Sequence, residues 1–265
     1  MRNSGKFLEN FWFKGLFYSS PEGIPQLSTV NCQLSIVNLR NPFPLIRNTQ
    51  RKKAIALRSC VIFCAAEFDR LLAPIDDSFL IAADGGLRHL EKLGLTPDAV
   101  IGDFDSLCYV PQGAAVYPVE KDDTDAMLAV KLGMEKGFRD FVLYGSLDGP
   151  RLDHTVANYQ LLKYLADRGA HGVLVGCSFC AAVVQNSSLR LKPHAEGDIS
   201  VFCMGPDAQG VSIRGLYYRL ENGTLSSGFP LGVSNHFIGQ EATVSVEKGA
   251  LLVLWRREAG LPEFQ

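Results

Sequence analysis

The segment Ala99-Val100-Ile101-Gly102-Asp103-Phe104-Asp105-Ser106 carries two carboxylates one residue apart, directly after a short apolar run. If residues 100–103 end a β-strand, Asp103 and Asp105 point to the same side, because alternate residues of a strand share a face. Such a pair favours Mg²⁺, a hard cation that proteins hold with one or two carboxylates and the phosphates of a substrate. The same residues are also typical of an Asx-rich turn after a strand, so the pair alone leaves both interpretations open.

Three further acidic segments stand where strand ends or helix starts would bring them beside this pair. Asp84 follows the apolar residues 80–83 and precedes two glycines that permit a close turn. Residues 121–125 read Lys-Asp-Asp-Thr-Asp and open a helix, and residues 151–154 read Arg-Leu-Asp-His and open another. Because open α/β sheets bind ligands at the carboxyl ends of their strands, we expect these groups to share one site.

The order of apolar runs and turn signals predicts an α/β fold in two domains. Buried strands are expected near residues 59–65, 80–83, 99–103, 141–145 and 172–176, and helices over 87–93, 123–136 and 151–168. This alternation is typical of right-handed βαβ units in a parallel sheet. From about residue 181 the pattern changes to short strands, which indicates a small antiparallel β-sandwich. We therefore expect a parallel-sheet catalytic domain at 54–180 and a β-sandwich domain at 181–265.

Local signals refine this outline. In the first turn of the helix at 123–136, Asp122 and Asp123 are expected to cap the helix or face solvent, which leaves Asp125 as the better ligand. Turn dipeptides between strands are expected at Asn222-Gly223 and Lys248-Gly249. Loops are expected to carry Tyr217-Tyr218 and residues 234–236, where these side chains either meet a ligand or form an ordinary rim of the sandwich.

Composition excludes several classes of protein. The net charge of −2 provides no basic field for nucleic acid. No run approaches the ~18 apolar residues of a membrane span. The seven cysteines are odd in number and lie mostly in apolar runs, which is typical of reduced thiols in a cytoplasmic protein. The single pair Cys177 and Cys180 has no second pair beside it, so we interpret it as strand core and not as a metal site. Residues 1–53 show a short repeat but no sustained period, and are expected to form an extension outside the fold, disordered or not part of it.

From about Cys60 to Trp255 the chain resembles the thiamine pyrophosphokinase family. The motifs are Asp-Gly-Gly at 84–86, Gly-Asp-Phe-Asp-Ser at 102–106, Lys-Asp-Asp-Thr-Asp at 121–125, Arg-Leu-Asp-His at 151–154 and Val-Ser-Asn at 233–235. Each is weak alone, but together they follow the order and approximate spacing of the family. The resemblance implies a homodimer with active sites between subunits. It also implies a transferase that moves pyrophosphate from ATP to the hydroxyethyl group of thiamine, giving thiamine diphosphate and AMP.

The resemblance assigns individual residues to three groups. Mg²⁺ and phosphate binding fall to Asp103, Asp105 and Asp125, and the catalytic group is completed by Arg151 and Asp153. ATP contacts are implied for Asp84, Gly85, Gly86, Ser106 and Thr124, and thiamine contacts for Tyr218, Ser234 and Asn235. Which carboxylate accepts the proton of the alcohol stays open. The loop at 64–69 lacks the glycine-containing sequence of many members, which leaves its contacts to the nucleotide open as well.

Two other classes of function compete with this interpretation. Haloacid-dehalogenase-like phosphohydrolases also place Asp-x-Asp after a strand, but they continue with a Thr-bearing segment, whereas Ser106 and Leu107 follow here. A non-enzymatic nucleotide- or thiamine-binding protein would keep Tyr218 and Ser234 without needing every carboxylate. Because all the key aspartates are present, the sequence favours the enzyme.

Overall fold

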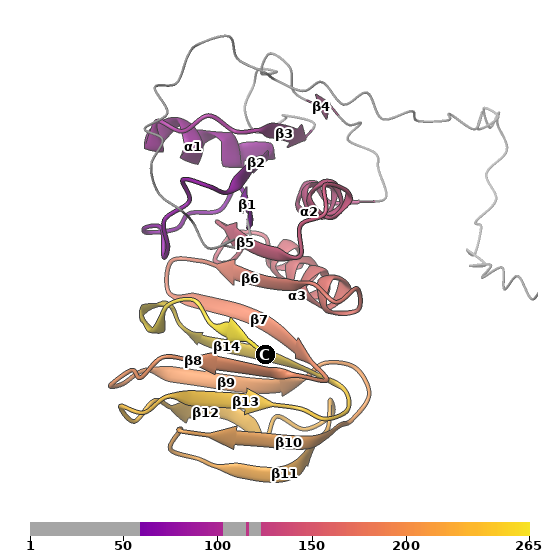
Figure 1. The fold of residues 1–265 in the computed structure, drawn as a ribbon, viewed down its shortest axis with the longest axis vertical. Helices are drawn as coiled ribbons and strands as arrows, with labels where there is room; N and C mark the ends of the chain where they lie inside the picture. The colour runs from indigo at the N-terminus through magenta and orange to yellow at the C-terminus, as the bar shows by residue number, and fades with distance from the viewer. Residues whose placement is uncertain (1–58, 103–114, 117–122) are drawn as a thin grey trace, which may run out of the picture. The chain divides into compact units, whose positions relative to one another are not determined.

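A computed structural model describes residues 59–102, 115–116 and 123–265, and the strands of this part of the chain form two sheets (Figure 1). The larger sheet has ten strands and the smaller has five. The predicted sites at Asp103, Asp105 and Ser106 and the predicted extension at 1–53 lie outside the described residues. The observed architecture is a mixed α/β sheet accompanied by a second, antiparallel sheet.

The first six strands form the parallel part of the large sheet. They are β1 (Cys60–Phe63), β2 (Phe79–Ala83), β3 (Ala99–Gly102), β4 (Ala115–Val116), β5 (Asp140–Tyr144) and β6 (His171–Val175). Their order is β6-β5-β1-β2-β3-β4, and β1 pairs in parallel with β5 on one side and with β2 on the other. The chain thus crosses from one side of β1 to the other after β4. The carboxyl ends of β1 and β5 form the switch point at which open α/β sheets bind ligands.

The large sheet continues into an antiparallel part, and the small sheet is entirely antiparallel. The added strands of the large sheet are β7 (Phe179–Gln185), β14 (Ala250–Arg256), β9 (Asp198–Cys203) and β12 (Gly232–His236), in that order beyond β6. The small sheet contains β11 (Leu220–Leu225), β10 (Ala208–Arg214), β13 (Ala242–Ser245), β8 (Ser188–Leu191) and β15 (Glu263–Phe264), in that order. β7 spans the expected domain boundary at 180/181, so one sheet runs through both expected domains. The division into domains itself stays a prediction.

Helices cover the two faces of the parallel part. They are α1 (Leu87–Leu93), α2 (Asp125–Glu135) and α3 (Leu152–Ala166), and a 3₁₀ turn, η1 (Asp84–Gly86), precedes α1. Alternate residues of β1 point to opposite faces: Ile62 packs in the cluster beneath α2 and α3, whereas Phe63 packs in the cluster that contains α1. A strand buried on both faces must be apolar throughout, which explains the uninterrupted run in β1.

The core on the α1 side also fills the space between the two sheets. Val253 and Trp255 of the large sheet belong to one apolar cluster with Leu189 and Ile213 of the small sheet. All four side chains are at least 96% buried. This shared core is the sandwich that the sequence predicts, with one of its two layers supplied by the antiparallel part of the large sheet.

Helix ends follow the sequence signals. α1 ends at Gly94, which adopts φ 66°, a left-handed conformation that glycine reaches without steric cost. α2 begins after Thr124, whose side chain accepts a hydrogen bond from the backbone N–H of Met127 at 3.2 Å. Thr124, and not Asp123, therefore caps α2, and of the two roles expected for Asp123 only a place at the surface remains. Its carboxylate instead accepts from Lys131 Nζ at 2.6 Å.

Three local expectations in the second half are also wrong. Asn222-Gly223 lies inside β11 and not in a turn between strands, because a register shift near Gly223 accommodates Asn222 at φ 49°. Residues 234–236 belong to the strand β12 and not to a loop. Cys180 is buried in β7, as strand core should be, but Cys177 is exposed in the turn before it.

Gly86 marks a close approach between η1 and β1, and we expect Gly86→Ala to destabilise the protein strongly. A Cβ at this position would lie 1.8 Å from the carbonyl oxygen of Phe63, so the backbone must shift. Overpacking of this kind costs about 3 kcal/mol or more, which lowers Tm by roughly 6 to 12 °C for a chain of this size. Gly228→Ala is the control, because a Cβ there meets only Ser226 Oγ at 3.9 Å. Calorimetry that finds equal Tm values for the two variants would contradict the tight contact.

No helix in the described part of the chain is long and apolar enough to cross a membrane.

Candidate functional site

Asp84 and Gly102 meet at the carboxyl edge of the parallel strands. β2 and β3 pair in parallel with Ala83 opposite Ile101, so each next residue leaves the sheet at the same edge. A Cβ on Gly102 would lie 3.0 Å from Asp84 Cα, which shows how closely the two backbones approach. Gly102 is the last described residue before Asp103. The structure therefore brings Asp84 beside the point where the Asp-x-Asp segment begins.

The loops that follow β1 and β5 lie against each other at the switch point. The backbone N–H of Ala66 donates to the carbonyl of Gly145 at 3.0 Å. A Cβ on Gly145 would lie 2.2 Å from Ala66 O, and Gly145 adopts φ 63°, so glycine is required there for both reasons. Beyond Gly145, the buried Asn158 of α3 donates from Nδ2 to the carbonyl of Ser146 at 2.7 Å. This hydrogen bond ties the loop after β5 to the helix that carries Arg151 and Asp153 at its start.

Asp125 reaches the same edge from the first turn of α2. Burial and the charge of Asp125 together raise the pKa of the Cys64 thiol to about 12. α2 packs against β1, β2 and β3, and Ala126 in its first turn packs on the apolar cluster that contains Cys64, so the start of this helix lies over the central strands. The thiol stays neutral at physiological pH, so Cys64 is not a nucleophile. Thr124 accepts the capping hydrogen bond of α2 through its oxygen, so its hydroxyl proton stays available for donation to a phosphate.

Arg151 and Asp153 form a two-pronged ion pair at the start of α3. Arg151 Nη2 donates to Asp153 Oδ2 at 2.5 Å, and Nε donates to Oδ1 at 3.2 Å. Both side chains are about two-thirds exposed, so the pair contributes little to stability but points its charges toward solvent at the sheet edge. The hydrogen bond from Arg151 lowers the pKa of the Asp153 carboxyl.

The predicted thiamine residues form a second group around β12. Asn235 is 4% exposed, and its side chain brackets the backbone of Tyr218: Oδ1 accepts from Tyr218 N at 2.9 Å, and Nδ2 donates to Tyr218 O at 2.6 Å. The ring of Tyr218 is exposed and meets the ring of Tyr217 edge to face at 4.9 Å. Ser234 stands at a register shift in β12 with φ 59°. Asn235 thus fixes Tyr218 and leaves its ring in solvent.

The carboxylate group near the ends of β2 and β3 and the thiamine group around β12 stand far apart within one chain. In the large sheet, six strands separate β2, which leads to Asp84, from β12, which carries Asn235 (Figure 1). At about 4.8 Å per strand, that separation is roughly 30 Å. No cluster of three His, Cys, Asp or Glu side chains suited to a metal forms within the described ranges.

Two family models match this chain. The thiamin pyrophosphokinase catalytic domain matches residues 75–174, and the thiamin pyrophosphokinase vitamin B1 binding domain matches residues 188–251. Together they span more than half of the chain. The chain belongs to the thiamine pyrophosphokinase family. Enzymes of this family are transferases that form thiamine diphosphate from thiamine and ATP, so the family inferred from the five motifs is confirmed.

Individual relatives agree with this membership. Thiamine pyrophosphokinase of Bacillus subtilis (strain 168) is 29% identical over 191 residues, which cover 66% of this chain and 85% of the relative. The crystal structure of the Bacillus subtilis thiamine pyrophosphokinase matches with a TM-score of 0.66 and 24% identity, over 75% of this chain and 99% of that one. Thiamin pyrophosphokinase of Geobacillus thermodenitrificans matches with a TM-score of 0.64 and 26% identity, over 75% and 97%. The thiamine pyrophosphokinase fold therefore extends over both sheets.

Non-glycine residues with positive φ occur in both the carboxylate group and the thiamine group of this thiamine pyrophosphokinase fold. The non-glycine residues with positive φ in the described ranges are Asp84, Asp148, Asn186, Asn222 and Ser234. Among non-glycine residues, asparagine and aspartate tolerate this region best, whereas serine adopts it at a cost that functional sites commonly carry. Asp84 and Ser234 were predicted as site residues. Asp148, in the loop after β5, was not, although its neighbours Gly149-Pro150 signal a turn.

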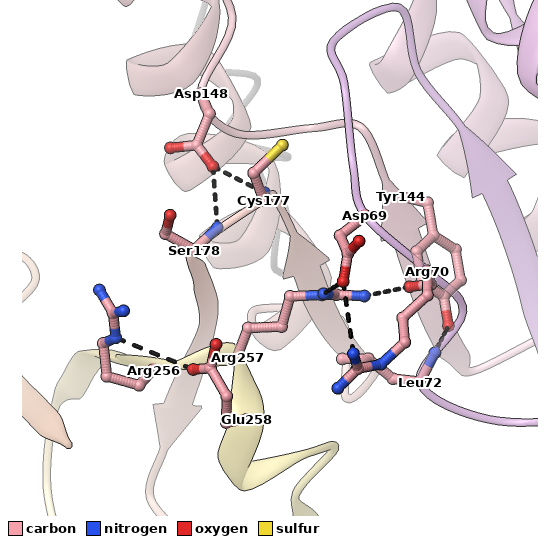
Figure 2. A network of polar contacts seen from close by, with 10 residues as sticks. All are labelled: Asp69, Arg70, Leu72, Tyr144, Asp148, Cys177, Ser178, Arg256, Arg257 and Glu258. Atoms are coloured by element: carbon pink, nitrogen blue, oxygen red, sulfur yellow. Dashed lines mark hydrogen bonds and ion pairs between the residues drawn. The ribbon is translucent and has the colours of Figure 1, made fainter.

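Two other residues near the switch point were missed by the sequence argument. His89 of α1 is buried and hydrogen-bonds through Nε2 to the carbonyl of Ala66 at 2.9 Å. Arg257, directly after β14, is buried and donates to Asp69 in the loop after β1 (Figure 2). A histidine or an arginine in an unremarkable stretch carries no local signal of a contact so distant in sequence.

We expect Asn235→Ala to raise the KM for thiamine by at least ~10-fold, which corresponds to about 1.4 kcal/mol and to the loss of the bracket around Tyr218. The KM for ATP should change less than twofold. Ser212→Ala is the matched control, because Ser212 Oγ also accepts a backbone hydrogen bond, from Asn222 N at 3.1 Å, but away from Tyr218. Steady-state kinetics with each substrate varied in turn makes the comparison. Equal effects of Asn235→Ala on both KM values would contradict a specific role in the thiamine group.

Proposed function

We propose that this chain transfers the pyrophosphoryl group of ATP to the hydroxyethyl oxygen of thiamine, with AMP as the leaving group. The observation that supports this most is that Asp84 and the helix that begins with Asp125 both belong to the parallel part of the sheet, in a chain that matches the catalytic and vitamin B1 binding domains of the thiamine pyrophosphokinase family. A polyphosphate bound there must be positioned and its charge neutralised, because phosphoryl-type transfers depend mainly on these two effects.

Asp103, Asp105 and Asp125 are the residues we assign to Mg²⁺. The carboxylate oxygens they supply are hard donors suited to that ion. The close contact between Gly102 and Asp84, with Asp103 next in sequence, fits a carboxylate cluster at this edge. When bound, Mg²⁺ supplies charge neutralisation to the phosphates. Asp84, Gly85, Gly86, Thr124 and Ser106 remain our proposed contacts to ATP.

Arg151 stabilises the negative charge that develops on the departing phosphate in this proposal. Its guanidinium is exposed at the sheet edge, and Asp153 orients it through both prongs of the ion pair. The lowered pKa of Asp153 makes this carboxylate a weak proton acceptor while the pair is intact. Asp153 therefore acts first as the partner of Arg151. The proton of the thiamine hydroxyl passes to a carboxylate of the cluster or to Asp153 once Arg151 turns to the phosphate.

Tyr218, Ser234 and Asn235 bind thiamine in this proposal. Thiamine contains a cationic thiazolium ring, which an exposed tyrosine face attracts by about 0.5 to 2 kcal/mol. Tyr218 presents such a ring, with 60% of the residue exposed and its backbone fixed by Asn235. Ser234 directly precedes Asn235 on β12. Asn235 serves chiefly by holding Tyr218, since its amide is already engaged.

The active enzyme in our proposal is a homodimer in which each site combines two chains. The carboxylate group and the thiamine group of one chain lie roughly 30 Å apart across the sheet, which is too far for one small substrate to bridge. Large apolar side chains are exposed on β12, on the segment before it and at 217–218, and a second copy would cover them; they are Tyr217, Tyr218, Phe229, Leu231 and Val233. We assign the enzyme to the cytoplasm, which the free thiols of Cys60, Cys64, Cys177, Cys180 and Cys203 support.

Incubation of the protein with ATP, Mg²⁺ and thiamine tests the proposed function. We expect thiamine diphosphate to appear and ATP consumption to stop when thiamine is omitted. A phosphohydrolase would instead release phosphate from phosphomonoesters without thiamine. A non-enzymatic binding protein would bind ATP or thiamine and leave both unchanged. Either result would refute the proposal.

A further inference from the structure

Arg257 connects the far side of the fold to the loop that follows β1. It opens a short 3₁₀ turn, η2 (Arg257–Ala259), immediately after β14, and only 2% of the residue is exposed. Its Nη1 donates to Asp69 Oδ2 at 2.7 Å, and its Nη2 donates to the carbonyl of Arg70. A buried guanidinium is costly unless it is paired, and here both pairing groups belong to the β1–β2 loop, residues 64–78. The charge therefore holds this loop in place.

The guanidinium of Arg257 donates to the β1–β2 loop but, within the described part of the chain, leaves one of its own donors unused. Nε of Arg257 is buried and finds no acceptor among the described residues. Asp69, in contrast, is largely exposed, and the hydrogen bond from Arg257 lowers the pKa of its carboxyl. Asp69 therefore stays ionised and available to Arg257 at neutral pH. A surface carboxylate held by a buried cation is typical of a tether for a loop.

A second set of contacts links the same residue to the loop after β5. The backbone N–H of Arg257 donates to Ser178 O at 3.1 Å. In the same turn, Asp148 Oδ2 accepts from Cys177 N at 2.8 Å and from Ser178 N at 3.5 Å (Figure 2). Asp148 adopts φ 61°, a left-handed conformation that aspartate tolerates in turns. Arg257 and the turn at 176–178 thus join both loops that flank the switch point.

The tethered loop reaches the proposed nucleotide site. Cys64, at its start, lies beside η1, because a Cβ on Gly86 would be 3.0 Å from Cys64 N, and Ala66 contacts the loop after β5. Further along, the backbone N–H of Leu72 donates to the hydroxyl of Tyr144 at 2.9 Å. The loop is therefore anchored to β5 and its following loop at two points, Ala66 and Leu72. Its sequence, Cys64-Ala-Ala-Glu-Phe-Asp69, lacks the glycines that would let it wrap a phosphate unaided.

We propose that Arg257 is a positioning residue for ATP, which holds the β1–β2 loop through Asp69 and Arg70 at the carboxyl end of β1. The inference rests on the proposed function, because it takes this edge as the ATP site. It goes beyond that function because it gives Arg257, which lies outside both ranges matched by the family models, a role in nucleotide binding.

Kinetics of Arg257→Met, Asp69→Ala and the double variant tests the proposal. We expect each single variant to raise the KM for ATP at least about tenfold while the KM for thiamine stays within twofold, and the double variant to be no worse than the more affected single one. Arg257→Lys should recover part of the affinity, since an ammonium replaces one prong of the fork. Arg190→Met is the matched control: Arg190 pairs with Glu263 to join β8 and β15, far from the switch point, and both KM values should stay unchanged.

Asp69→Ala keeps the test decisive even if Arg257→Met fails to fold, because Asp69 is on the surface. A folded Asp69→Ala protein with the wild-type KM for ATP would overturn the proposal. Equal increases in both KM values, or fully additive effects in the double variant, would show that Arg257 has only a structural role. Either result would also overturn the proposal.

Hydrogen exchange separates this inference from the proposed function. In Asp69→Ala we expect faster exchange across residues 64–78 than in the wild type, and weaker protection of these amides by added ATP, whether or not the protein turns over thiamine. Wild-type protein that produces no thiamine diphosphate would refute the proposed function. Unchanged exchange in the loop would refute the tether by itself.

Discussion

Asp125→Asn should lower kcat at least ~10²-fold, in the range expected for the loss of one strong electrostatic contributor at a reacting phosphate. The substitution keeps the shape of the side chain and removes the charge that, after burial, raises the pKa of Cys64. Asp103→Asn and Asp105→Asn should have effects of the same size, because the three carboxylates are assigned to one ion. Stability should change little or rise slightly without metal, since a crowded negative charge is removed.

Asp123→Asn is the matched control for this prediction. Asp123 stands two residues before Asp125, at the same helix start, but its carboxylate pairs with Lys131 at 2.6 Å. We expect activity within about threefold of wild type, because an ion pair near the surface contributes little. The Mg²⁺ concentration for half-maximal activity should rise in Asp125→Asn and stay constant in Asp123→Asn. Near-normal turnover in Asp125→Asn would remove Asp125 from the metal group.

Two inactive variants should restore activity when mixed. Asp103→Asn protein lacks the proposed phosphate half, and the double variant Tyr218→Ala with Ser234→Ala lacks the proposed thiamine half. After subunit exchange, random pairing gives about half heterodimers with one intact site of two, so recovered activity should approach about a quarter of wild type. The prediction follows from the six strands that separate β2 from β12 within one chain.

The mixing experiment needs proof that subunits exchange. Mass spectrometry of intact dimers with one isotope-labelled variant supplies it, and each variant mixed with itself gives the background. If heterodimers form and activity stays at background, each site lies within a single chain. The shared-site proposal would then be wrong, and the distance between the two groups would need a different explanation.

The sequence predicts the parallel part of the fold well because its signals are local. The apolar run at 60–63 is long enough for a strand and too short for a helix, and Gly94 and Gly137 end helices in left-handed conformations that the structure confirms. The motifs at 84–86 and 102–106 follow strands, so parallel pairing alone predicts that they leave the sheet together. The contact between Asp84 and Gly102 agrees with that reasoning.

Features that depend on distant partners could not be predicted in this way. Asn222-Gly223 has the composition of a turn, but pairing with β10 draws it into β11 through a register shift. The strand β12 reads Gly-Val-Ser-Asn-His, which lacks the alternation of a half-buried strand, because it is an edge strand with a shifted register. Arg257 is separated from Asp69 by 188 residues, and no local pattern indicates that contact.

The identity of the nucleotide product tests the central claim most directly. The protein is incubated with Mg²⁺, thiamine and ATP that carries a label in its γ-phosphate, and AMP, ADP and the thiamine phosphates are separated by chromatography. Transfer of the pyrophosphoryl group predicts AMP and labelled thiamine diphosphate in equal amounts, without labelled thiamine monophosphate before it. Formation of ADP with labelled thiamine monophosphate, or of free phosphate independent of thiamine, would contradict it.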